Sequence, residues 1–180
     1  MRRVLVVYAS RHGATAGIAG KICEVLQSHG IDTVVADATR NPDPSGFDAY
    51  VIGSAAYIGK WEKAAREFVH RHEAVLVSKP CWLFSSGPVG TERVNKQGES
   101  LLADPNTVAE LKPLLRPRGT QVFFGAWDPD APHASLAERL IVKMPAIRDV
   151  LPAGDFRDWP AIEAWAREIA AEVTGPVPVG

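Results

Sequence analysis

One short segment carries the side chains with the clearest chemistry in the sequence. It joins an apolar run to a stretch with helical periodicity, and it reads Tyr8-Ala9-Ser10-Arg11-His12-Gly13-Ala14-Thr15. The first N–H groups of a helix have no acceptor within the helix, and the helix dipole is positive at that end. We therefore predict that this segment binds a phosphate at the start of a helix.

The side chains of the segment suit an anion. Ser10 and Thr15 can donate hydroxyl hydrogen bonds, and Gly13 lets the backbone approach a ligand closely. Arg11 and His12 add positive charge if they point toward the phosphate.

Alternating apolar runs and helical patterns must position this segment. The apolar runs predict strands, and the apolar side chains between them recur at three- and four-residue steps, as in amphipathic helices. This order is typical of an α/β fold in which a parallel sheet has helices on both faces. Gly30 is expected to end the first helix, and Asp158 to begin the last one. The predicted strands cover about residues 3–9, 32–37, 48–54, 80–85 and 120–126.

The chain has the length of one domain. Its 180 residues can bury a core without metals or disulfides. We expect a single domain over residues 1–174 and a loose tail at 175–180. Two connections, 87–103 and about 127–157, are long for a compact domain. The second is expected to be a helical insertion, because Ser135-Leu136-Ala137-Glu138 has the pattern of a capping box.

Three loops follow predicted strands at the edge where ligands bind in a doubly wound sheet. Besides the first loop, they are residues 53–61 after the third strand and 84–90 after the fourth. All three are rich in glycine and hydroxyl side chains, which suits a planar ring held above a phosphate. Tyr57 is expected to stack on such a ring. Trp61 fits the core face of the next helix equally well.

Two common phosphate-binding motifs are absent after the first strand. The sequence there has neither the dinucleotide pattern G-x-G-x-x-G nor the G-K-[ST] ending of a triphosphate loop. Dinucleotides and nucleoside triphosphates are therefore disfavoured as ligands.

The first loop resembles the mononucleotide loop of the flavodoxin superfamily, which has the form hydroxyl-x-hydroxyl-Gly-x-Thr. Ser10, Gly13 and Thr15 match that form, and His12 stands in place of the middle hydroxyl.

Further features narrow the resemblance. The aromatic-Ile-Gly core of loop 53–61 and Phe156-Arg157-Asp158-Trp159 before the last helix resemble one branch of the superfamily. This branch includes the bacterial quinone-dependent protoporphyrinogen dehydrogenases, and the resemblance covers nearly the whole chain.

The resemblance implies a flavodoxin-like fold with strand order 2-1-3-4-5 and FMN as the cofactor. It also implies an oxidoreductase of porphyrin biosynthesis that oxidises protoporphyrinogen, or a related reduced donor, and passes the electrons to a quinone. Trp127 could cover the ring or a substrate, or simply close the end of the sheet. The residues expected to contact FMN are Ser10, Arg11, His12, Gly13, Ala14, Thr15, Ser54, Ala55, Ala56, Tyr57, Ile58, Gly59, Ser85, Ser86, Gly87 and Trp127.

Other kinds of site have little support in the sequence. No catalytic acid or base stands out, and no histidine, cysteine and carboxylate group has the spacing of a metal site. Cys23 and Cys81 form no C-x-x-C pair and are expected to be buried apolar side chains.

Charge and hydropathy restrict the partners. A net charge of −1 gives no electrostatic footprint for nucleic acid. The longest apolar runs fall far short of the ~20 residues that span a bilayer. Residues 1–9 lack the apolar core of a signal peptide, so we expect a cytoplasmic protein.

The stretch 135–148 places Arg139, Lys143 and Arg148 beside apolar residues. Two alternatives remain open for it. It is either a lid helix packed on the domain or a weak membrane-surface helix. The second alternative would place the protein at the inner face of the cell membrane, where a quinone is available.

Three functional hypotheses remain at this point. The chain is an FMN-dependent enzyme, an electron carrier between redox proteins, or an interaction domain that keeps the fold without flavin. The near-zero charge counts against the carrier, because such proteins commonly steer encounters with a strongly charged face. The departure at His12 keeps the third hypothesis open.

Overall fold

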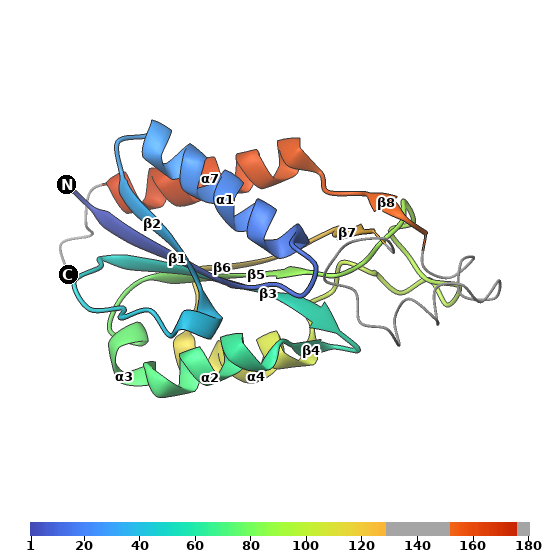
Figure 1. Cartoon of the computed structure of the whole chain (residues 1–180), viewed down its shortest axis with the longest axis horizontal. Helices are drawn as coiled ribbons and strands as arrows, with labels where there is room; N and C mark the ends of the chain where they lie inside the picture. Colours follow the sequence, from blue (N-terminus) through green and yellow to red (C-terminus); the bar gives the residue numbers. More distant parts are fainter. Residues whose placement is uncertain (129–151, 176–180) are drawn as a thin grey trace.

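The computed structural model describes residues 1–128 and 152–175, and a parallel sheet forms its centre (Figure 1). The strands lie in the order β2-β1-β3-β5-β6, with parallel pairing throughout this path. The predicted fold class and the order 2-1-3-4-5 are confirmed, since the fourth and fifth predicted strands are β5 and β6. The bounds are β1 Arg3–Ala9, β2 Asp32–Asp37, β3 Ala49–Tyr57, β5 Cys81–Ser86 and β6 Gly119–Phe123.

Helices cover both faces of the sheet (Figure 1). On one face lie α1 (Ala14–Ser28) and α7 (Trp159–Thr174). On the other lie α2 (Lys63–Arg71), α3 (Glu73–Leu76) and α4 (Asn106–Leu115). A short 3-10 helix, η1 (Ala38–Arg40), follows β2.

Strand β1 shows why the sheet needs two helical layers. Val4 and Val6 pack in the cluster with α1 and α7, whereas Leu5 and Val7 pack in the cluster on the other face. All four are at most 1% exposed. A continuous apolar run is therefore buried on both sides, as in parallel sheets generally.

Both predicted helix boundaries are confirmed. Gly30, just past α1, has a φ of +75° and donates its N–H to the Gln27 carbonyl at 2.9 Å. At the start of α7, the Asp158 carboxylate accepts the Ala161 N–H at 3.0 Å. These two caps fix the end of α1 and the start of α7.

A hairpin replaces the loop expected after the third strand. β3 runs to Tyr57, three residues beyond the predicted end at 54, and pairs antiparallel with β4 (Lys60–Trp61). The turn of this hairpin is Ile58-Gly59, and both residues have positive φ. The apolar pattern does not reveal such a turn, because its first position usually holds asparagine or glycine.

The last parallel strand is shorter than predicted. β6 ends at Phe123, and the Gly125 N–H turns away to donate to the Pro88 carbonyl at 2.8 Å. The chain then forms β7 (Ala126–Trp127), which pairs antiparallel with β8 (Gly154–Asp155). The prediction of one strand through residue 126 is therefore wrong in its last residues. Of the predicted insertion, residues 129–151 lie outside the described part, as do residues 176–180 of the predicted tail.

The two cysteines are buried apolar side chains, as predicted. The Cys23 thiol donates to the Thr33 carbonyl, and the Cys81 thiol to the Leu115 carbonyl, each at 3.6 Å. Burial raises the pKa of Cys81 to about 11, so this thiol stays protonated at neutral pH.

Candidate functional site

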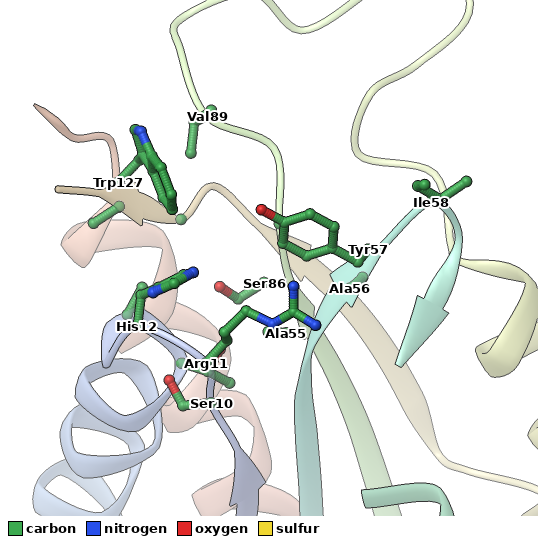
Figure 2. A pocket seen from close by; sticks show the side chains of 15 residues that line it. Ser10, Arg11, His12, Ala55, Ala56, Tyr57, Ile58, Ser86, Val89 and Trp127 are labelled. Atoms are coloured by element: carbon green, nitrogen blue, oxygen red, sulfur yellow. The ribbon is translucent and has the colours of Figure 1, made fainter. Parts of the chain in front are cut away.

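A cavity of about 280 Å³ lies at the carboxyl edge of the sheet (Figure 2). Its walls come from the β1–α1 loop, the end of β3, the loop after β5 and the turn between β6 and β7. This volume lies near the lower end of the ~300–1,000 Å³ common for small-molecule sites. The lining residues are Ser10, Arg11, His12, Ala14, Thr15, Ala55, Ala56, Tyr57, Ile58, Ser86, Gly87, Val89, Gly125, Ala126 and Trp127.

Most of the residues predicted to contact a cofactor therefore line one cavity. Three lining residues were not in the prediction, namely Val89, Gly125 and Ala126. Val89 lies within the glycine-rich loop 84–90, so that loop was the available signal. Gly125 and Ala126 enter only because β6 ends early, which the apolar pattern does not show.

The start of α1 has the geometry of an anion site. Gly13 precedes the helix with a φ of +87°, which glycine adopts readily. The Ser10 hydroxyl accepts the Gly13 N–H at 2.9 Å and keeps its own proton for donation. Thr15 is 1% exposed and lines the cavity. The first turn of α1 contains no acidic residue, so no carboxylate there opposes an anion.

Two serines predicted as cofactor contacts serve the hairpin instead and do not line the cavity. The Ser54 hydroxyl donates to the Ala55 carbonyl at 2.8 Å and accepts the Glu62 N–H at 2.9 Å. The Ser85 hydroxyl accepts the indole N–H of Trp61 at 2.8 Å. Trp61 is 2% exposed, so it packs in the core. These hydroxyls hold the end of β3 against its neighbours.

Gly59 and Gly13 also lie outside the lining. Gly59 packs against Asn106, where an added Cβ would come within 3.2 Å of the amide nitrogen. The Gly13 N–H donates to the Ser10 hydroxyl, so this glycine shapes the start of α1 without lining the cavity. Sequence alone could not separate such residues from those that face the cavity, because all lie in the same loops.

Arg11 points across the cavity rather than at the helix start. Its guanidinium lies 4.6 Å from the centre of the Tyr57 ring (Figure 2). Its Nε lies 3.3 Å from Glu62 Oε1. The arginine therefore links the first loop to the hairpin. It sets a cation at the mouth of the cavity, beside an aromatic ring that is 43% exposed.

A second aromatic side chain faces Tyr57 across the mouth. Trp127 is 6% exposed and meets His12 edge to face, with ring centres 4.9 Å apart (Figure 2). The indole nitrogen of Trp127 is buried and has no hydrogen-bond partner among the described residues.

The hairpin turn carries an unfavourable residue. Ile58 has a φ of +49° and its side chain is 95% exposed, so it has backbone strain without compensating burial. We predict that Ile58→Asn raises the free energy of unfolding by about 1 kcal/mol, because asparagine tolerates this conformation. Urea unfolding measures the change. Ile58→Val is the matched control and should give no gain, and equal stabilities for all three chains would contradict the strain argument.

A profile of the flavodoxin domain matches residues 5–148. The chain belongs to the flavodoxin domain family. This membership makes it a flavodoxin-fold flavoprotein.

One curated relative extends over nearly the whole flavodoxin-fold chain. It is the protoporphyrinogen IX dehydrogenase (quinone) of Escherichia coli K12, which is 27% identical over 181 residues. The match covers 93% of this chain and 94% of the relative.

Two solved structures show the same fold. Oxidised flavodoxin 2 from Bacillus cereus superposes with a TM-score of 0.58 at 18% identity, over 94% of this chain and 99% of that one. The rubredoxin oxygen:oxidoreductase of Desulfovibrio gigas gives a TM-score of 0.59 at 12% identity. The match covers 96% of this chain but 36% of that longer protein. At these identities the likeness concerns the fold alone.

Residues 1–128 and 152–175 hold no cluster of three or more histidines, cysteines and carboxylates that could bind a metal ion. Within those same ranges, no helix is long and apolar enough to cross a membrane. The stretch 135–148, predicted as a lid or a membrane-surface helix, lies outside the described residues and stays a prediction.

Proposed function

We propose that this chain is an FMN-dependent oxidoreductase that oxidises a reduced small molecule and passes the electrons to a quinone. The observation that carries the proposal is the cavity, which joins the start of α1 to two aromatic side chains. Membership of the flavodoxin domain family supports a flavin as the ligand. The name of the E. coli relative supports a porphyrinogen as donor and a quinone as acceptor.

The cavity fits both ends of FMN. The first-turn N–H groups of α1, with the Ser10 and Thr15 hydroxyls, would hold the phosphate. Tyr57 and Trp127 would border the ring from opposite sides of the mouth.

FMN, when bound, supplies the capacity to accept electrons from one molecule and donate them to another. The protein orients it and restricts the access of water. Ala55 and Ala56 present small side chains, which leave the backbone of β3 within reach of a ligand.

In the proposed reaction, each pair of electrons and pair of protons lost by the donor converts one quinone to its quinol. A porphyrinogen loses six electrons and six protons when it becomes a porphyrin, so three quinones are reduced to quinols for each porphyrin formed. No side chain of the described cavity is assigned as a catalytic acid or base.

The experiment is an anaerobic titration of the purified chain loaded with FMN. We expect protoporphyrinogen to bleach the visible flavin absorbance and a menaquinone analogue to restore it, with porphyrin fluorescence rising in step. The control contains free FMN at the same concentration without the chain. Air must be excluded, because porphyrinogens also oxidise without an enzyme.

The other outcomes separate the remaining hypotheses. A chain that binds no FMN would contradict the proposal and favour an interaction domain. A chain whose flavin is reduced by a flavodoxin reductase but not by the porphyrinogen would favour an electron carrier.

A further inference from the structure

Arg157 lies between β8 and α7 and reaches back to the start of α1. Its Nε and Nη2 donate to the two Asp155 oxygens at 2.8 and 2.6 Å, which is a bidentate pair. Its Nη1 donates to the Ala14 carbonyl at 3.4 Å. The guanidinium also lies 4.5 Å from the Trp159 ring centre, and the side chain is 18% exposed. Four contacts thus hold the arginine at one place.

Gly17 leaves room for this arginine. A Cβ added at Gly17 would overlap Arg157 Nη1, whereas a Cβ added at Gly20, one turn later, would meet nothing within 4 Å. A glycine inside a helix costs about 1 kcal/mol relative to alanine. At Gly17 the absence of a side chain lets the Arg157 guanidinium lie directly on the first turns of α1.

The cation stands at the end of α1 where the helix dipole is already positive. Asp155 balances it. Hydrogen bonds from the Arg157 side chain and backbone hold the pKa of Asp155 below its usual value. The carboxylate therefore stays ionised at neutral pH and keeps the arginine in its place.

Residues 154–157 also hold Trp127, one of the aromatic side chains that line the cavity. Gly154 and Asp155 pair with Trp127 and Ala126, and the Phe156 N–H donates to the Gly125 carbonyl at 3.0 Å. Arg157 then ties this strand pair to the backbone of Ala14, which lines the cavity. Trp127 and the start of α1 are therefore linked through the Arg157 side chain.

We propose that Arg157 is a positioning residue for the phosphate of the cofactor. It fixes the first turn of α1 at the Ala14 carbonyl, while the Asp155 carboxylate balances its charge. The proposal rests on the FMN-dependent function proposed above. Arg157 makes no contact with the ligand in this role and acts through the backbone of α1.

The test compares FMN with riboflavin, which has the same ring and no phosphate. Dissociation constants are measured by quenching of flavin fluorescence for wild type, Gly17→Ala, Arg157→Ala and the double variant. Gly20→Ala is the matched control, since it changes the same residue type on the same helix where no neighbour is touched. Arg157→Lys tests whether a cation at this position is enough for FMN binding without the bidentate geometry of the guanidinium.

We expect Gly17→Ala to push the flexible end of Arg157 aside and Arg157→Ala to remove it. Each should raise the FMN dissociation constant about tenfold, which corresponds to about 1.4 kcal/mol, and leave riboflavin nearly unchanged. The double variant should equal the Arg157→Ala chain, because the two changes remove one contact. Gly20→Ala should match wild type, and Arg157→Lys should recover part of the affinity.

Three results would overturn the positioning role. They are unchanged FMN binding in both single variants, an equal loss for riboflavin, or effects of the two changes that multiply in the double variant. Urea unfolding of each chain without flavin shows whether it is folded. A wild-type chain that binds neither flavin would instead overturn the proposed function itself, so the two failures are distinct.

Discussion

Ala14→Glu raises the FMN dissociation constant at least a hundredfold while the flavin-free chain stays as stable as wild type or becomes slightly more stable. Ala14 is the first residue of α1 and lines the cavity. A carboxylate at a helix start is favourable by about 0.3–1 kcal/mol. The same charge repels a phosphate about 4 Å away by roughly 4 kcal/mol at an effective dielectric of 20. Since each 1.4 kcal/mol is a factor of about ten, binding suffers far more than folding gains.

The control for this change is Ala14→Gln, which has the same size and no charge. We expect its FMN dissociation constant to stay within about fivefold of wild type, and riboflavin to bind both variants nearly equally, because neutral groups lack the repulsion. Fluorescence quenching gives the affinities and urea unfolding gives the stabilities. Equal FMN affinity in the Glu and Gln variants would mean that the phosphate does not lie at the start of α1.

Gly53→Ala is expected to lower the free energy of unfolding by about 3 kcal/mol, the upper part of the range for overpacked cores. An added Cβ would overlap the ring of Phe84, which is 0% exposed. That ring is confined by Phe123 and Trp165, whose centres lie 6.4 and 6.2 Å away. It therefore cannot move aside without disturbing the packing of α7 on the sheet.

Urea unfolding tests this prediction, with Gly20→Ala as the control that should stabilise the chain by about 1 kcal/mol. Phe84→Leu should relieve the overlap, so the double variant should be more stable than the sum of the two single effects. Additive effects would show that the Phe84 ring is not what excludes a side chain at Gly53. Because β3 also carries Ala55 to Tyr57 to the cavity, Gly53→Ala should weaken flavin binding as well.

Local sequence patterns were enough to predict the features whose burial or backbone geometry depends on nearby residues. The run Val4 to Val7 is buried on both faces, and an apolar strand without alternation has no other stable place. Gly30 and Asp158 marked helix ends because a left-handed turn and an N-cap are set by the residue itself. The loop at residues 10–15 was found for the same reason, since a strand, a glycine and a helix start are adjacent in the chain.

Contacts between distant residues were beyond such patterns. Ser54 and Ser85 looked like ligand contacts, and only the packing of Trp61 and Glu62 shows that their hydroxyls are used inside the fold. The sequence left open whether Arg11 points toward the phosphate, and its contacts with Glu62 and Tyr57 across the mouth come from distant parts of the chain. Each of these side chains has several possible partners, and the sequence does not show which of them it contacts.

By itself, the sequence determined the α/β class and the three loops that meet at one edge, because these follow from apolar periodicity and from residues with special backbone conformations. The flavodoxin-like fold and its strand order followed from the resemblance of those loops to a known family. The tertiary structure decided which loop side chains face the cavity and which support it. It also brought Arg157 to the start of α1, over a separation of 143 residues. A hydrogen bond or ion pair between such distant positions depends on the packed geometry of the whole sheet, and no local pattern records it.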